Sequence, residues 1–117
     1  MQPDLEDRGR LEDIIAYGER ALRHLGRLSH DEFVANETCY DAVVRCMAVV
    51  GEAAWKLSKE FQAAHPATPW LLIATMRHKL VHDYGSIDTT IIYRSAREYL
   101  PELIEQCRQI ASHDALP

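Results

Sequence analysis

The sequence predicts an all-α protein folded as an up-and-down bundle of four to five helices. Apolar residues recur at three- and four-residue spacing along most of the 117 residues, which is the period of a helix with one buried face. No alternating strand pattern, internal repeat or low-complexity tract interrupts them. The periodic stretches are separated by short segments rich in Ser, Asp, Pro and Gly, and short connections favour antiparallel neighbours in a bundle.

Length and composition predict one domain spanning residues 1–117, since this length buries one core but not two. A formal net charge of −5 argues against a general nucleic-acid coat, so any nucleic acid must meet a local basic pocket. We expect no contact with DNA. The first residues lack the apolar run of a secretory signal, and no apolar stretch approaches the ~20 residues of a membrane span. These features predict a cytoplasmic protein without a membrane partner.

The first predicted helix runs from Leu5 to Leu28. Its apolar positions recur at helical spacing, with charged residues between them, at Leu11, Ile14, Ile15, Leu22, Leu25 and Leu28. Residues 29–31 (Ser-His-Asp) interrupt this pattern, and Asp31 or Asn36 could cap the helix that follows.

A long second helix is predicted from about Thr38 to about Ala64. His65-Pro66 ends it, because the residue before a proline resists helical backbone angles. Gly51 lies in its interior, where a glycine costs roughly 1 kcal/mol relative to alanine. That cost indicates that another backbone approaches closely at this position.

The third predicted helix begins with Thr68 as N-cap and Pro69 at the first helical position, and Gly85 suits a left-handed C-terminal cap. Its predicted apolar face consists of Trp70, Leu71, Ile73, Met76, Leu80 and Val81.

Asp88 is expected to cap the fourth helix. Pro101 should break or kink this segment, because proline removes a backbone donor and clashes with the preceding turn. Apolar residues continue with helical period beyond it toward a frayed end at His113 to Pro117.

Three cysteines and two tryptophans are predicted to be structural. Cys39, Cys46 and Cys107 show no C-x-x-C spacing, which favours buried free thiols. Trp55 and Trp70 are expected to pack in the core.

Charge, a proton-transfer group and a phenol converge at residues 77–84, Arg-His-Lys-Leu-Val-His-Asp-Tyr. A guanidinium binds a phosphate through two parallel N–H groups, and an imidazole gives or takes a proton near neutral pH. Internal RNA cleavage needs a base for the 2′-hydroxyl, positive charge on the phosphorane and an acid for the leaving 5′-oxygen. The sequence therefore makes Arg77 and His82 candidate catalytic residues of a ribonuclease that needs no metal or other cofactor.

Helix geometry constrains this hypothesis. At about 100° per residue, Arg77 and His82 point about 140° apart on a straight helix, whereas His78 and His82 share a face and Tyr84 lies close to Arg77. One straight helix therefore does not direct both catalytic candidates at one phosphate. Either the helix unwinds before His82, or two chains assemble the site.

The motif Arg-x4-His-x-Tyr, formed by Arg77, His82 and Tyr84, resembles that of the HEPN superfamily. The likeness is strongest to the HepT-like RNase toxins, which are paired with minimal nucleotidyltransferase (MNT) antitoxins. The likeness extends in order over most of the chain, at residues 10–14, 41–45, 51–54, 69–70 and 100–101. Where many relatives have asparagine after the motif arginine, this chain has His78. His78 is therefore a spectator, a second proton-transfer group or a donor that orients the ligand.

The resemblance implies a HEPN-like bundle, a homodimer in which both motif helices line a shared cleft, and an RNA substrate. It implies a toxin that is silenced when the partner nucleotidyltransferase attaches AMP to Tyr84, while the cleavage chemistry itself implies a 2′,3′-cyclic phosphate product. The alternative is a non-catalytic HEPN subunit that binds a nucleotide or a partner protein within a nucleotidyltransferase complex.

Other interpretations of the same residues remain open from the sequence. Arg77 could pair with Glu52 or Asp83, and Tyr84 could be a core aromatic with its hydroxyl at the surface. His78 and His82, at i and i+4, could also bind zinc with Asp83 or Asp88 as a further ligand, although two histidines without a strong third ligand are a weak signal.

Overall fold

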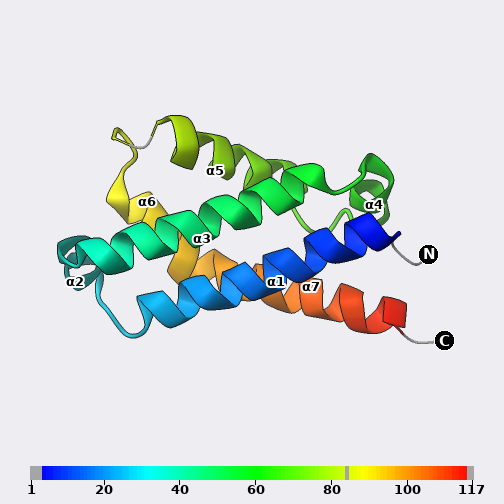
Figure 1. The fold of residues 1–117 in the computed structure, drawn as a ribbon, viewed down its shortest axis with the longest axis horizontal. Coiled ribbons are helices and arrows are strands. Elements are labelled where there is room, and N and C mark those ends of the chain that lie inside the picture. Colours follow the sequence, from blue (N-terminus) through cyan, green and yellow to red (C-terminus); the bar gives the residue numbers. More distant parts are fainter. Residues whose placement is uncertain (1–3, 84, 116–117) are drawn as a thin grey trace.

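The computed structural model describes residues 4–83 and 85–115, and these residues fold as an all-α, up-and-down bundle (Figure 1). Four long helical runs make up the bundle. Three are single helices, α1 (Leu5–Leu25), α3 (Glu37–Lys56) and α5 (Trp70–His82). The fourth is the continuous series α6 (Thr89–Arg94), η1 (Ser95–Tyr99) and α7 (Leu100–Ala115). Two short helices, α2 (His30–Ala35) and α4 (Lys59–Ala64), occupy the connections at opposite ends. The predicted fold class is confirmed, with no strand among the described residues.

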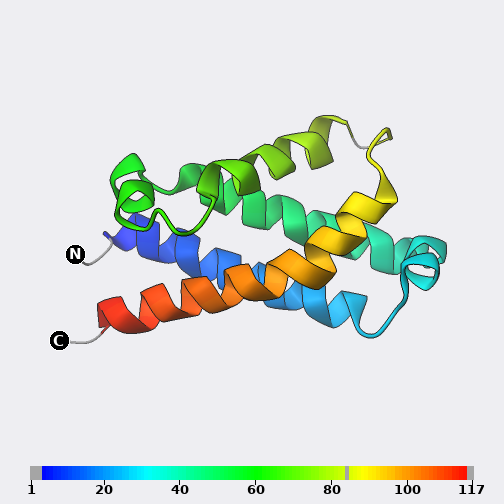
Figure 2. The same cartoon turned by 180° about the vertical axis from the view of Figure 1, so that it is seen from behind.

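Helix α3 is the central element, with α1 packed on one side and α5 on the other. The series α6–η1–α7 crosses the back of the bundle and packs on α1 (Figure 2). The largest side chains with almost no exposed surface are Phe33, Leu11, Ile14, Leu25, Ile92, Val43 and Cys107. No described helix combines the length and the hydropathy that crossing a membrane requires.

Helix α1 ends three residues earlier than predicted, at Leu25. Gly26 adopts a positive φ of 53°, and its N–H donates to the Leu22 carbonyl at 2.9 Å. Left-handed backbone is available to glycine without a side-chain clash, so the chain leaves the helix here although Leu28 continues the apolar period.

Ser29 caps the short helix α2, which the sequence analysis did not predict, and of the two candidate caps Asp31 and Asn36 it is Asn36 that caps the following long helix. The Ser29 hydroxyl accepts from the Glu32 N–H at 3.2 Å, and the Glu32 carboxylate accepts from the Ser29 N–H at 2.9 Å. This reciprocal capping box satisfies two donors that the helix leaves unpaired, and the bond from the Ser29 N–H lowers the pKa of the Glu32 carboxyl. Asn36 caps α3 as predicted, by accepting from the Cys39 N–H at 3.0 Å.

The predicted second helix is split, because α3 ends at Lys56 and a new helix begins at Lys59. Asp7 of α1 is buried, and its carboxylate accepts from the Ser58 N–H at 2.8 Å and from the Ser58 hydroxyl at 2.6 Å. The Ser58 hydroxyl in turn accepts from the N–H of Phe61 and so caps α4. A long-range contact therefore ends α3 early, while the predicted helix end at Ala64 is confirmed.

Both predicted caps of the third helix were wrong. Pro69, not Thr68, is the residue before α5, because the buried Thr68 hydroxyl donates to Gln106 Oε1 at 3.0 Å. At the other end Asp83 is the cap, and its N–H donates to the Lys79 carbonyl at 2.8 Å. Asp83 has φ −110° and ψ 25°, which any residue adopts, so the end of α5 requires no glycine at position 85.

Asp88 caps α6 as predicted, by accepting from the Thr90 N–H at 2.8 Å. The helix does not break at Pro101 but becomes a π-helix over η1, where the Leu100 N–H donates to the Ser95 carbonyl five residues earlier. The wider turn accommodates a residue that lacks an N–H and crowds the turn before it. Helix α7 extends past His113 to Ala115, and residues 116–117 of the end that was predicted to fray lie outside the described residues.

All three cysteines are buried and free, as predicted. Burial raises the pKa of the Cys107 thiol to about 12, while the Cys39 thiol donates to the His24 carbonyl at 2.7 Å. Trp70 is buried as predicted and donates to the His65 carbonyl at 2.9 Å. Trp55 is 64% exposed, so its assignment to the core was wrong.

Candidate functional site

Arg77 lies on the side of α5 that faces α3, where Gly51 of α3 allows the two helices to approach closely. A methyl group at Gly51 would come within 3.0 Å of Arg77 Cα, and closer still to Arg77 Cβ, and would lie 3.1 Å from the Ile73 carbonyl oxygen. Any larger residue at position 51 would push the two helices apart. The close backbone approach that the mid-helix glycine predicted is confirmed, and it occurs at the motif arginine.

The Arg77 side chain forms an ion pair with Glu52 of α3, one of the two partners that the sequence left open. Arg77 Nε lies 2.6 Å from Glu52 Oε2, and Lys56 Nζ lies 3.2 Å from Glu52 Oε1. Both Arg77 and Glu52 are about one third exposed, at 33% and 35%. One carboxylate thus contacts two cations at the interface of α3 and α5, and the three formal charges sum to plus one.

His78 and His82 lie together on a different side of α5. Their ring centroids are 4.5 Å apart, and both residues are exposed. The expectation that they share a face is confirmed. Because Arg77 contacts α3 while His82 faces outward in the last turn of α5, a straight helix within one chain does not direct the two groups at the same point.

Tyr84 lies outside the described residues, so its predicted role is untested by the structure. The zinc alternative finds little geometric support. Among the described residues no three His, Cys, Asp or Glu side chains are grouped as metal ligands would be, and the Asp88 carboxylate is engaged as the cap of α6.

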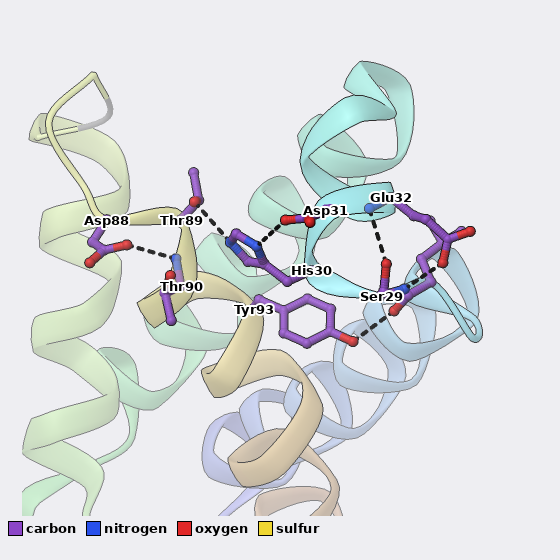
Figure 3. Close-up of polar contacts among 9 residues, drawn as sticks. Ser29, His30, Asp31, Glu32, Asp88, Thr89, Thr90 and Tyr93 are labelled. Carbon is purple, nitrogen blue, oxygen red and sulfur yellow. Dashed lines mark hydrogen bonds and ion pairs between the residues drawn. The ribbon is translucent and has the colours of Figure 1, made fainter.

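A polar cluster around His30 ties the start of α2 to the start of α6 (Figure 3). His30 Nδ1 lies 3.1 Å from Asp31 Oδ1, and His30 Nε2 lies 3.1 Å from Thr89 Oγ1. The His30 ring also meets the Tyr93 ring edge to face, and the Tyr93 hydroxyl donates to the Leu28 carbonyl at 2.7 Å. The cluster anchors the helix that follows the motif. Sequence reasoning missed it, because His30 was interpreted only as part of a helix break.

Helix α5 also exposes apolar side chains near its start. Leu71 is 72% exposed and Leu72 is 68% exposed, although Leu71 and Val81 were predicted on a buried face. Leu72 borders a mostly apolar cavity of about 260 Å³ between α5, α3 and the η1–α7 segment, and the exposed Tyr99 borders the same cavity. One helix therefore presents both uncovered leucines and titratable residues to solvent.

Known proteins similar to this chain carry ribonuclease names. The family model described as Ribonuclease HepT-like matches residues 14–110. A protein named "Putative RNase" from Caldanaerobacter subterraneus is 35% identical over 100 residues, covering 86% of this chain and 89% of its own. Another of that name from Methanocaldococcus jannaschii is 32% identical over 100 residues, covering 86% and 83%.

A protein named "Probable ribonuclease HepT" from Thermococcus cleftensis is 30% identical over 93 residues, which cover 80% of this chain and 84% of its own. No solved structure matches the chain significantly. The family model spans most of the helical bundle, including Gly51, Glu52 and the whole of α5. The chain therefore belongs to the ribonuclease HepT-like family.

Proposed function

We propose that this protein is a metal-independent endoribonuclease that acts as a cytoplasmic toxin, with Arg77 and His82 as its catalytic residues. The observation that carries the proposal is their placement on α5. A guanidinium seated against α3 and an imidazole on the outer face occupy the last two turns of one helix, and both are accessible. The ribonuclease names of similar proteins favour RNA as the substrate.

Two chains are needed to complete the site, because Arg77 and His82 point to different sides of α5. A two-fold homodimer formed through α5 would place two copies of each residue around one axis. Leu71 and Leu72 supply apolar surface for such a contact, and Leu71 lies on the same side of α5 as His78 and His82. Pairing would also concentrate positive charge locally on a chain of net charge −5.

The chemistry follows from these groups. The imidazole of one His82 takes the proton of the RNA 2′-hydroxyl, whose oxygen attacks the adjacent phosphorus. Arg77 stabilises the charge that grows on the non-bridging oxygens, and the imidazolium formed at that same His82 gives its proton to the leaving 5′-oxygen. The products are a 2′,3′-cyclic phosphate and a 5′-hydroxyl. His78, in ring contact with His82, is proposed as an auxiliary residue that orients that imidazole.

The proposed regulation is AMPylation of Tyr84 by a cognate nucleotidyltransferase antitoxin of the MNT type. The Tyr84 phenol oxygen would attack the α-phosphorus of ATP and release pyrophosphate, which leaves an anionic phosphodiester and a bulky base on the tyrosine. That group would occupy the RNA cleft and pair with its positive charge. Tyr84→Phe should preserve toxicity and escape the antitoxin. Intact-mass spectra showing one AMP on the Tyr84→Phe chain at the wild-type level would contradict this assignment.

The direct test of function is incubation of the purified protein with total RNA in excess chelator, followed by mapping of the cut ends. We expect cleavage with 2′,3′-cyclic phosphate ends by wild type and none by His82→Ala. Cleavage that disappears in chelator would contradict the metal-independent mechanism. Induced expression should arrest growth only with an active site, whereas a non-catalytic HEPN subunit would leave growth unchanged.

A mixed dimer tests whether two chains share the site. One chain carries Arg77→Ala and the other carries His82→Ala. If each centre combines Arg77 of one chain with His82 of the other, the mixed dimer keeps one complete centre and cleaves RNA. If each centre forms within one chain, no complete centre remains and the mixed dimer is inactive.

A further inference from the structure

Glu52 contacts the proposed catalytic arginine directly, and its surroundings indicate more than a surface ion pair. It follows Gly51, the residue that lets α3 and α5 meet at Arg77, so the backbone contact and the carboxylate act on the same residue from the same helix. The contact joins Arg77 Nε, the inner donor of the guanidinium, to Glu52 Oε2 at 2.6 Å. A guanidinium carries five N–H donors, four of them on its two terminal nitrogens, and this ion pair is made at the inner nitrogen.

The second observation concerns the carboxylate itself. Glu52 Oε2 is a buried atom on which no donor in the described part of the chain is aligned for a hydrogen bond, although Arg77 Nε lies close to it. Buried polar atoms without an aligned donor are uncommon in native proteins, and each one calls for a specific explanation. A partly exposed ion pair contributes about 1 kcal/mol or less to stability, so stability alone is a weak reason to hold a carboxylate there.

A carboxylate beside an RNA-binding arginine would repel the phosphates of RNA, and Lys56 offsets that repulsion. Its ammonium group lies 3.2 Å from Glu52 Oε1, one helical turn along α3, and offsets the carboxylate charge. The cluster of Lys56, Glu52 and Arg77 keeps a net positive charge. It can therefore hold the arginine side chain in place without repelling a phosphate.

We propose that Glu52 is a positioning residue of the RNA-cleaving site, which binds Arg77 through Nε and thereby presents the two terminal nitrogens of the guanidinium to the scissile phosphate. Bidentate binding of phosphate requires a fixed guanidinium plane, and a small misplacement of a catalytic group costs up to roughly 10²-fold in rate. This proposal rests on the proposed ribonuclease function.

The test compares Glu52→Ala, Glu52→Gln, Arg77→Ala and the double variant Glu52→Ala/Arg77→Ala in chelator-containing cleavage assays. We expect Glu52→Ala to lower kcat by roughly 10²-fold and Glu52→Gln, which keeps an oxygen acceptor, to lower it by only about 10-fold. The double variant should be no worse than Arg77→Ala, because residues that act through one another are not additive. Glu19→Ala, which removes the α1–α7 pair of Glu19 with Arg108 (2.7 Å), is the matched control and should cleave like wild type.

A second measurement separates this inference from the proposed function. In ¹⁵N-labelled protein, ¹⁵N relaxation at Arg77 Nε should report an ordered side chain in wild type and a more mobile one in Glu52→Ala, whether or not RNA is cleaved. Wild type that shows an ordered Arg77 side chain but cleaves no RNA would contradict the proposed ribonuclease and leave the contact intact. Full activity of Glu52→Ala, or a double variant much weaker than Arg77→Ala, would overturn the positioning role.

Discussion

Helices α1 and α5 both pack against α3, yet they use that contact differently. On α1, Leu11, Ile14 and Leu25 are at most 1% exposed, so the centre of its apolar stripe is fully covered. On α5, Leu71 and Leu72 remain in solvent, while an arginine occupies part of the face toward α3. Apolar residues in water and a charged residue at a helix interface both oppose folding stability, and such violations concentrate at functional sites. The difference supports the proposal that α1 is scaffold and that α5 is the working helix, which carries the site.

The sharpest test of this contrast compares two arginines that each pair with a glutamate on a neighbouring helix. Arg77→Ala should reduce RNA cleavage by about 100-fold or more, because it removes the charge that stabilises the phosphorane. Arg108→Ala breaks the Arg108–Glu19 pair on the scaffold side and should leave the cleavage rate close to wild type. Equal losses of activity in the two variants would contradict the division between scaffold and working helix.

Glycine substitutions test the same contrast through backbone spacing. Gly51→Ala should destabilise the protein by about 1–3 kcal/mol and reduce cleavage, because the new methyl group would press on Arg77 Cα and the Ile73 carbonyl. Gly9→Ala of α1, where a methyl group meets nothing within 4 Å, should stabilise the helix by about 0.5–1 kcal/mol. Urea unfolding and cleavage rates measure both. A Gly51→Ala protein with wild-type stability would show that the contact of α3 with α5 is softer than the geometry indicates.

Exposed leucines provide a third comparison, which concerns the proposed dimer. Replacing Leu71 and Leu72 together by serine should weaken dimerisation by about 10-fold or more, since each buried leucine contributes about 1.5–3 kcal/mol. Leu5→Ser on α1, at a leucine that is 88% exposed, should leave the dimer unchanged. Sedimentation equilibrium gives both dissociation constants. Unchanged dimerisation in the Leu71 and Leu72 variant would place the interface elsewhere.

The smallest expected effect concerns the scaffold at alkaline pH. Burial raises the pKa of the Cys107 thiol from 9.0 to about 12, so between these values the unfolded chain loses this proton while the folded chain keeps it. The resulting stabilisation is complete below pH 9 and is lost as pH rises toward 12. Thermal unfolding at about pH 8 and about pH 10 should show a decline in Tm that is shallower in Cys107→Ala. An identical slope in both proteins would contradict the assignment.

Local signals predicted much of the fold correctly. The four helical runs, the caps at Asn36 and Asp88, the buried cysteines and the close approach at Gly51 all follow from residues within a few positions of the feature. Two of the errors occurred where a distant residue competes. The Asp7 carboxylate accepts hydrogen bonds from Ser58, where α3 has ended. The Thr68 hydroxyl donates to Gln106 and therefore does not cap α5.

The candidate site divides in the same way. Its residue types and the separation of Arg77 from His82 around α5 follow from the sequence, because helical geometry fixes side-chain direction within one element. Which of the possible partners Arg77 contacts, the exposure of Trp55 and Leu71, and the link from His30 to Thr89 depend on how helices far apart in the chain are placed. The sequence by itself determined the helical runs and the residue types of the candidate site that one of them carries. Only the tertiary structure decided which neighbour each side chain meets, because packing between helices is set by all of them at once.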